Sequence, residues 1–181
     1  MKKLPALTLL FLLILIGISE TSRAQSKKVD AEKRIAELGI ELIKPSPPTA
    51  SFVKAVKVGN MVYLSGHGPD RPDGTKVIGK LGSELTTEQG KEAARLVGIS
   101  LLSSLKSEIG DLNKVNRVVK VLGMVNAIPG FEAHSQVMNG FSDLMVEIFG
   151  ENGKHARSSV GMSSLPGNIP VEIEMIVELK K

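Results

Sequence analysis

Hydrophobic and polar positions alternate along several stretches of the chain, as expected for strands with one buried face. Residues 171–179 place Val, Ile, Met, Val and Leu at every second position, with glutamates at most positions between them. Residues 52–58 and 61–65 flank Gly59-Asn60, a dipeptide typical of a two-residue hairpin turn. Such period-two patterns predict strands that pack one face on a core. We therefore expect a β-hairpin early in the folded region and a strand at its end.

Two other stretches repeat hydrophobic residues every three or four positions, the spacing of an amphipathic helix. The first begins at Thr86, which has capping-box spacing with Gln89, and it can end at Gly110. The second covers residues 134–149 and is followed by Gly150, a residue suited to a helix C-terminus. Two long helices are therefore predicted.

Weaker patterns complete the set of expected elements. Residues 27–39 mix charged and apolar positions and end at Gly39, which predicts a short N-terminal helix. Residues 115–125 are rich in β-branched side chains, residues 159–162 can form a further strand, and residues 70–82 form a polar, glycine-rich loop. The order ββ-α-β-α-β predicts an α+β fold with two helices on one face of a mixed sheet. Because the other face would be largely apolar, we expect oligomer contacts there.

The first 24 residues have the layout of a secretory signal peptide. Lys2 and Lys3 precede an apolar run at residues 4–18, and Ala24 supplies a small residue before the expected cleavage site. The run is about 15 residues, whereas a membrane-spanning helix needs roughly 20, although an uncleaved N-terminal anchor is the alternative. We expect an exported protein, with the periplasm as its compartment. The expected organisation is a signal peptide at 1–24, an N-terminal extension with a short helix at 25–48, and one domain at 49–181.

Composition and charge narrow the possible functions. Beyond residue 24 the chain has 20 basic and 18 acidic residues, a net charge of +2 instead of the +4 of the whole sequence. Six aromatic residues and the lack of a long Lys/Arg run give little support to nucleic-acid binding. The absence of cysteine excludes disulfides, thiolate nucleophiles and cysteine-ligated metals. Three histidines without regular spacing also give little support to a metal site, so none is expected.

The residues best suited to chemistry lie near the C-terminus. Arg157 lies near one predicted strand and Glu172 begins the next. A guanidinium stays charged and can hold a carboxylate through two parallel hydrogen bonds. A partly desolvated glutamate can move a proton or position a water, because burial raises the pKa of a carboxyl group. The pair predicts a pocket for a carboxylate-bearing substrate, and a structural ion pair between strands or subunits is the alternative.

An ordered set of short motifs resembles the RidA/YjgF family (reactive intermediate deaminase, or L-PSP). The motifs are Ser65-Gly66, Asn139 in the second helix, Ala156-Arg157-Ser158, Leu165-Pro166 and the Val-Glu-Ile-Glu that begins at Val171. The likeness runs from about Pro48 to Leu179 and is greatest to the branch with Ser-Gly-His-Gly-Pro and His-Ala-Arg-Ser motifs. This resemblance implies a chorismate-mutase-like fold that forms a homotrimer, with ligand clefts between neighbouring subunits.

The resemblance also implies an activity and roles for individual residues. Deaminases of this family hydrolyse enamines and imines of the 2-aminoacrylate type to 2-keto acids and ammonia, without a metal or cofactor. By resemblance, Arg157 binds the substrate carboxylate and Glu172 positions the attacking water. Ser65, Gly66 and Asn139 are further candidates for substrate binding.

The sequence departs from the deaminase pattern at four positions. Phe52 stands where deaminases usually have a tyrosine, so one hydroxyl is missing, and His67 replaces a glutamine. Ser159 replaces a residue that is often cysteine, and Gly161 replaces a larger, often acidic residue. Phe52, His67 and Ser159 are therefore candidate substrate-binding residues that would alter which substrate is accepted.

The histidines and one serine allow more than one role. His67 is either an acid–base group near neutral pH or a hydrogen-bonded turn residue. His155 either lies in the pocket or is a hydrogen-bonded turn residue, and His134 is expected to start the second helix. Ser65 as a nucleophile would need a base within hydrogen-bond reach, and His67, two residues later, is expected to point elsewhere.

Three functional hypotheses follow. The favoured one is an exported, trimeric enamine/imine deaminase or related small hydrolase that needs no cofactor and no membrane contact after signal cleavage. The alternative is a non-catalytic trimer that binds small carboxylates, which the missing tyrosine hydroxyl favours. A ribonuclease is the third, and the near-neutral charge and few aromatic residues argue against it.

Overall fold

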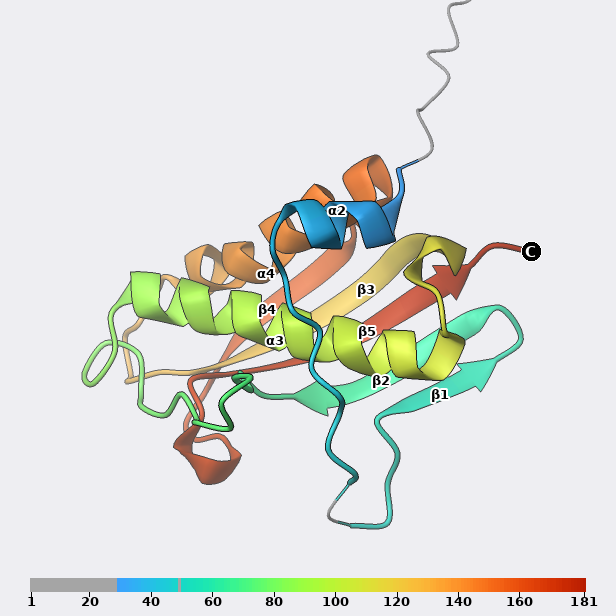
Figure 1. Ribbon diagram of the computed structural model, residues 1–181. Coiled ribbons are helices and arrows are strands. Elements are labelled where there is room, and N and C mark those ends of the chain that lie inside the picture. Colours follow the sequence, from blue (N-terminus) through green and yellow to red (C-terminus); the bar gives the residue numbers. More distant parts are fainter. Residues whose placement is uncertain (1–28, 49) are drawn as a thin grey trace, which may run out of the picture.

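The computed structural model describes residues 29–48 and 50–181. The predicted signal peptide and the first residues of the predicted extension lie outside the described residues. The helices and strands follow one another as in Figure 1: α2 (Ala31–Glu37), β1 (Ala55–Val58), β2 (Met61–His67), α3 (Thr87–Ile109), the 3-10 turn η1 (Leu112–Lys114), β3 (Val115–Asn126), α4 (His134–Phe149), η2 (Gly150–Gly153), β4 (Ala156–Met162), η3 (Pro166–Asn168) and β5 (Val171–Leu179).

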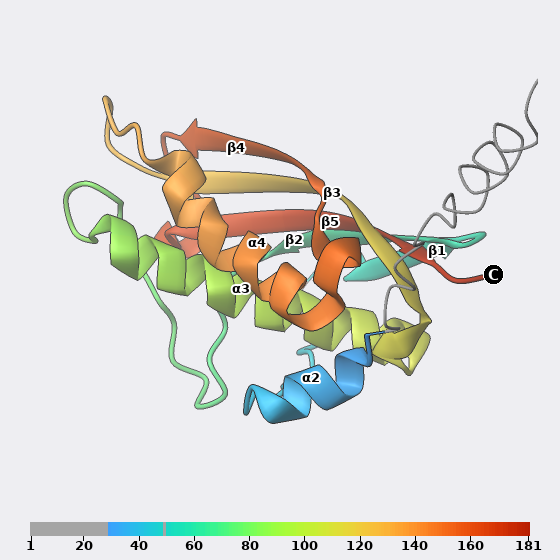
Figure 2. The ribbon, with the colours of Figure 1, turned by 90° about the horizontal axis from the view of Figure 1, so that it is seen from above.

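The strands form one five-stranded sheet in the order β1-β2-β5-β3-β4. All neighbours are antiparallel except β3 and β4, which run parallel because α4 carries the chain back between them. Figure 2 shows α3 and α4 on the same side of this sheet. The predicted α+β class, with a mixed sheet and two helices on one face, is therefore confirmed. The order also places β3 between β4 and β5, although β4 and β5 follow each other in the chain.

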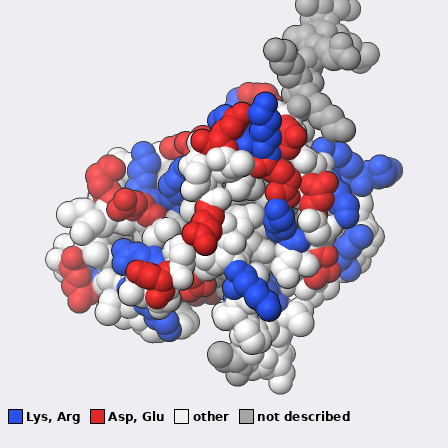
Figure 3. Space-filling model, viewed as in Figure 1, with Lys and Arg blue, Asp and Glu red and all other residues white. Residues whose placement is uncertain are grey.

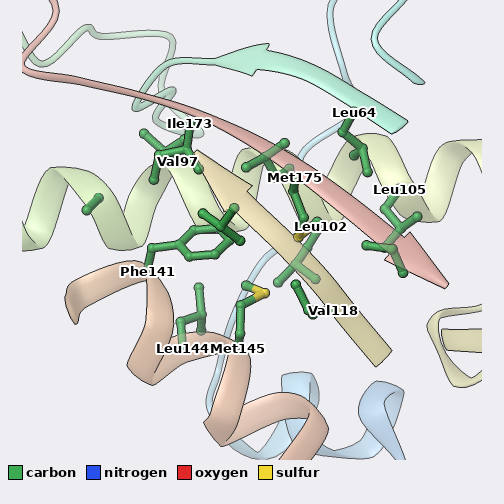
Figure 4. Packing of buried hydrophobic residues seen from close by; sticks show 14 of the residues in the cluster. Leu64, Val97, Leu102, Leu105, Val118, Phe141, Leu144, Met145, Ile173 and Met175 are labelled. Atoms are coloured by element: carbon green, nitrogen blue, oxygen red, sulfur yellow. The ribbon is translucent and has the colours of Figure 1, made fainter. Parts of the chain in front are cut away.

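The core lies between the sheet and the two long helices. Phe141, Leu144 and Met145 of α4 and Leu102 of α3 point towards the inner face of the sheet (Figure 4). On β5 the inner residues include Met175, which is almost fully buried. Burial on one face only is the packing that the alternating and 3.6-residue patterns predict.

The ends of α3 follow the predicted capping residues. The Thr86 hydroxyl accepts the Gln89 N–H at 3.2 Å, and the Gln89 side-chain oxygen accepts the Thr86 N–H at 2.9 Å. This reciprocal pair satisfies two donors that would otherwise lack partners at the helix start. Gly110 ends the helix at φ +80°, in the left-handed region that favours glycine.

The segment before the sheet packs on the outer side of the helical layer. The short helix α2 contacts α4, and the chain after it crosses α3 on its way to β1 (Figure 1). The Glu32 carboxylate accepts hydrogen bonds from Lys106 Nζ at 2.5 Å and from the Leu112 N–H at 3.0 Å. The helix is shorter than predicted and ends before Gly39, which has φ +63°.

Three strands differ from the predicted boundaries. Strand β1 begins at Ala55, because the Phe52 N–H donates to the Ala50 carbonyl at 2.8 Å and bends the chain before the strand. Strand β2 continues to His67, with an irregular register between Leu64 and His67. Strand β4 begins at Ala156, three residues earlier than predicted, because its pairing with β3 starts there.

The face of the sheet away from the helices carries exposed apolar side chains. These are Val56, Val58, Tyr63, Val160 and Met162, each between 37% and 60% exposed. A shallow trough of about 310 Å³ on this face includes Tyr63, Leu122 and Ile176. Among the described residues, no helix has both the length and the apolar character needed to cross a bilayer.

Candidate functional site

The guanidinium of Arg157 is held against helix α4. Its Nη1 donates to Asn139 Oδ1 at 3.1 Å and to Ser142 Oγ at 2.9 Å, and its Nη2 donates to the Ser135 carbonyl at 3.3 Å. Asn139 and Ser142 are three residues apart, so they lie on the same side of the helix. Partial burial lowers the pKa of Arg157 and Asp143 opposes this, and the group stays charged at neutral pH. No ion pair to Arg157 occurs within the described residues.

A half-buried histidine, His155, completes this hydrogen-bond chain. His155 Nδ1 lies 2.7 Å from the Gly153 carbonyl, which can only accept, so Nδ1 carries the proton. His155 Nε2, 3.1 Å from Ser142 Oγ, therefore accepts the serine hydroxyl, and that hydroxyl oxygen accepts Arg157. Burial lowers the pKa of His155 and the Arg157 charge lowers it further, although the bond to Gly153 has the opposite effect. A neutral His155 thus fixes Ser142, which in turn orients Arg157.

Glu172 lies on the other face of the sheet. It alternates with the buried Val171 and Ile173 of β5, so its side chain points away from the helices. Its carboxylate covers Gly66 of β2, where an added Cβ would overlap the Glu172 carboxyl oxygen. Burial raises the pKa of Glu172, and the negative charge of Glu174 raises it further. A carboxyl group with a raised pKa gives up and takes back a proton more readily than an exposed one, which suits a group that moves protons.

The irregular end of β2 separates Ser65 and His67. The Ser65 hydroxyl donates to the Lys54 carbonyl at 3.4 Å, and Ser65 lines the trough on the apolar face. His67 is only 5% exposed and points into the helical layer, where its Nε2 lies 2.7 Å from Ser104 Oγ. The ring contacts the carbonyl of Ser65 and not its hydroxyl, so these two residues do not form a nucleophile–base pair.

The remaining predicted residues lie apart from one another. Phe52 is 48% exposed in the bend before β1. Ser159 pairs with Gly123 in the parallel register, and its hydroxyl is buried without a partner in the described structure. A Cβ at Gly161 would overlap the His134 ring, so a small residue there makes room for the first residue of α4.

A single chain does not bring the two central residues together. Arg157 binds acceptors on α4, Glu172 points to the opposite face, and β3 lies between their strands. An ion pair between them within one chain is therefore absent from the described residues. Among residues 29–48 and 50–181, no group of three acidic, histidine or cysteine side chains could hold a metal ion.

Sequence reasoning missed Ser142 and the supporting role of His155. The signal for Ser142 is its spacing of three from Asn139, because residues at that spacing share a helix face. For His155 the sequence shows only that it is two residues before Arg157. Its bond to Gly153 depends on η2, a turn that no periodic pattern predicts.

Comparison with known proteins gives the family. Residues 32–179 match the family described as "YjgF/chorismate mutase-like, putative endoribonuclease". The chain is 39% identical to Protein TCP17 of Trypanosoma cruzi over 146 residues, which cover 80% of this chain and 91% of that protein. It is 31% identical to the 2-iminobutanoate/2-iminopropanoate deaminase of Dermatophagoides farinae, over 74% of this chain and 89% of that one.

A solved structure shares the fold. The protein Atu1372 of Agrobacterium tumefaciens, described as having unknown function, is 38% identical and superposes with a TM-score of 0.77, covering 83% of this chain and 92% of that one. The sheet order, the helix positions and the family match all agree with the resemblance that the motifs indicate. The chain therefore belongs to the RidA/YjgF (L-PSP) family.

Proposed function

We propose that the protein is a homotrimeric hydrolase that converts a 2-imino acid, or its enamine, into a 2-keto acid and ammonia. The observation that carries this proposal is the arrangement around Arg157. Its charge has no carboxylate partner within the described chain, and three acceptors on α4 hold its fork in place. A preoriented guanidinium of this kind suits the carboxylate of a small substrate.

The separation of Arg157 from Glu172 favours a site built by two subunits. Head-to-tail contacts close into rings, and in the proposed trimer the β4 edge of one subunit would lie beside the open sheet face of the next. The exposed apolar residues of that face, such as Val56 and Tyr63, would then be covered. This contact can bring Arg157 of one subunit near Glu172 of its neighbour, with the substrate between them.

The proposed chemistry requires only orientation and one proton carrier. Glu172 accepts a proton from water as the water oxygen bonds to C2 of the protonated imine, which gives a carbinolamine with a neutral amine. Glu172 returns this proton to the nitrogen. The C–N bond then breaks and the C=O bond forms as the hydroxyl group gives its proton back to Glu172, and the departing ammonia takes that proton and leaves as ammonium. Because an imine is already reactive, positioning supplies much of the acceleration. The raised pKa of Glu172 suits both steps.

A direct assay tests this proposal. Freshly generated 2-iminopropionate is supplied, and pyruvate release is compared with the spontaneous rate. Arg157→Ala should lower kcat/KM by about 10²–10³-fold, because removing one partner of a hydrogen-bonded charge pair costs roughly 2–5 kcal/mol. Arg95→Ala is the matched control, since Arg95 lies on α3 in a half-buried pair with Glu147 of α4 and contacts neither Arg157 nor Glu172. Equal rates for wild type and Arg157→Ala would contradict the proposal.

A second candidate is a carboxylate-binding trimer without catalysis. Phe52 favours it, because the phenylalanine side chain has no hydroxyl group that could bind the substrate. Calorimetry with pyruvate and 2-ketobutyrate separates the two functions. Arg157-dependent binding without any turnover of 2-iminopropionate would select the binding protein.

RNA cleavage remains the disfavoured third function. Lys/Arg and Asp/Glu side chains are interspersed on the face seen in Figure 3, and no continuous basic stripe appears there. A basic stripe is the expected footprint of a protein that binds nucleic acid. Cleavage that survives repurification and is lost in Glu172→Ala would restore this hypothesis.

Export to the periplasm is also part of the proposal. It rests on the basic start and apolar run at residues 2–18 and on the small residues before Gln25. Intact mass measurement of the protein from a periplasmic extract tests it. A chain that begins at Gln25 supports export, and a full-length chain confined to the cytoplasm contradicts it.

A further inference from the structure

A second cavity lies on the helical side of the sheet. Its volume is about 570 Å³, within the range of pockets that bind small molecules. The segment 41–46, the end of β2, the loop 70–76 and helix α3 surround it. Neither Arg157 nor Glu172 lines it, so the site proposed above does not account for it.

Three serines of α3 form the floor of this cavity. Ser100, Ser103 and Ser104 are each only 4% exposed, and all three line the cavity. Ser103 Oγ donates to the Ile99 carbonyl at 2.8 Å, as is common for serine within a helix. Ser100 Oγ has no hydrogen-bond partner among the described residues. A buried hydroxyl without a partner destabilises a fold, so its retention needs an explanation.

His67 fixes the orientation of the third serine. Its Nδ1 lies 2.7 Å from the Ser65 carbonyl and must donate, so Nε2 accepts the Ser104 hydroxyl at 2.7 Å. The hydrogens of Ser103 and Ser104 are therefore committed, and their oxygens can still accept. Ser100 can both donate and accept. The floor thus suits a ligand that has several hydroxyl groups.

The rim of the cavity is predominantly cationic. Four basic residues and two acidic ones line it, and none forms an ion pair within the described structure: Lys44, Lys54, Arg71, Lys76, Glu41 and Asp70. Lys54 Nζ donates instead to Ser46 Oγ at 3.3 Å and so links the residue before β1 to the crossing segment. An excess of uncompensated positive charge beside a partly enclosed space favours an anionic ligand.

We infer that this cavity binds a small hydroxylated anion, such as a sugar acid or a sugar phosphate. Its carboxylate or phosphate lies at the lysine and arginine rim. Its hydroxyl groups donate to Ser103 and Ser104 and accept from Ser100. This site is independent of the deaminase chemistry and lies on the opposite side of the sheet from Glu172.

Matched six-carbon probes test the two parts of the inference. Gluconate carries both the anion and the hydroxyls, hexanoate lacks the hydroxyls, and sorbitol lacks the charge. Calorimetry on the whole protein should show gluconate binding at least about tenfold more tightly than either control, because each control loses interactions of one kind. Glucose 6-phosphate is the fourth probe, and its affinity relative to gluconate shows which anionic group is preferred.

Two variants with matched controls locate the binding. Ser100→Ala should weaken binding about fivefold to tenfold through the loss of one hydrogen bond, whereas Ser107→Ala, on the exposed side of the same helix, should not. The Ser100→Ala chain keeps its fold, since no described group bonds to that hydroxyl. Lys54→Met should weaken binding more than Lys57→Met, which alters an exposed residue of the strand that follows Lys54.

Amide chemical shifts decide where the probe lies. Shifts on addition of gluconate or glucose 6-phosphate should centre on residues 100–104 and 41–46. The inference is overturned if neither anion binds at millimolar concentration, if hexanoate binds as tightly as gluconate, or if Ser100→Ala behaves like Ser107→Ala. Shifts confined to β4 and α4 would also overturn it, because they would assign the anion to Arg157.

Discussion

The two polar regions of the proposed active site differ in how the fold fixes their charged groups. Three acceptors on α4 hold the Arg157 guanidinium, and His155 supports one of them. Glu172 has no such hydrogen-bond partner among the described residues and is positioned by packing over Gly66. Hydrogen bonds fix the orientation of a charged group, whereas packing fixes its position and removes water from around it. The difference suits a fixed anion receptor and a carboxyl group that remains free to exchange a proton.

The largest effect is expected at the carboxyl group. Glu172→Gln keeps the shape and removes the proton carrier, so kcat for 2-iminopropionate should fall about 10²–10⁴-fold with little change in KM. Glu108→Gln, at an exposed position of α3, is the control. A Glu172→Gln enzyme with normal kcat would show that Glu172 takes no part in proton transfer.

The next largest effect is expected when the space above Gly66 is filled, and it should appear in the free energy of unfolding. Gly66→Ala adds a Cβ that overlaps the Glu172 carboxyl group, and overpacking of this kind typically destabilises by about 1–3 kcal/mol. Urea unfolding of wild type and variant measures this change. The double variant Gly66→Ala/Glu172→Ala removes the overlapping group and should recover much of the loss. No recovery would show that Gly66 is needed for its backbone and not for its contact with Glu172.

The hydrogen-bond chain behind Arg157 should give a smaller effect. Ser142→Ala removes one acceptor of Arg157 and the donor to His155. Each lost hydrogen bond contributes roughly 1 kcal/mol, and water partly replaces both. The value of kcat/KM should therefore fall about tenfold. The change should appear mainly in KM. Ser135→Ala is the control, since Arg157 binds only the backbone carbonyl of Ser135. Equal loss in both variants would indicate a general effect on α4.

The smallest expected effect is a dependence of stability on pH. Burial lowers the pKa of His155 below its ordinary 6.5, so the unfolded chain takes up this proton at a higher pH than the folded one. The contribution of neutral His155 to the stability of the fold is fully present above the ordinary pKa of histidine. It is lost as the pH falls through the lower pKa that His155 has in the folded chain. The melting temperature should therefore decrease on acidification, and His155→Gln should reduce that slope. An unchanged slope would show that His155 does not contribute.

The sequence predicts most of the elements because their signals are local. Thr86 and Gln89 specify the start of α3, and residues 134–149 match α4 to the residue. The insertion of β3 between β4 and β5 is not local, because it depends on which strands pair after α4 has crossed the sheet. The candidate residues could thus be selected from the motifs, but their placement on opposite faces could not.

The surroundings of individual side chains are the feature of the structure that the sequence predicts least well. The contact between His67 and Ser104 joins residues 37 positions apart, and only the fold places them together. The same holds for Gly66, whose role depends on the β2–β5 register beside Glu172. A turn motif indicates that a glycine is tolerated, and only the paired strand shows which side chain needs the space.

Subunit mixing tests the central claim, that Arg157 and Glu172 of different subunits form one site. Arg157→Ala and Glu172→Gln proteins are mixed in equal amounts, exchanged by mild denaturation and refolding, and checked by native mass spectrometry for mixed trimers. Random exchange in a closed ring pairs an intact Arg157 with an intact Glu172 in about a quarter of the sites, so about a quarter of wild-type activity should return. Mixed trimers that remain as inactive as their parents would contradict a site shared between subunits.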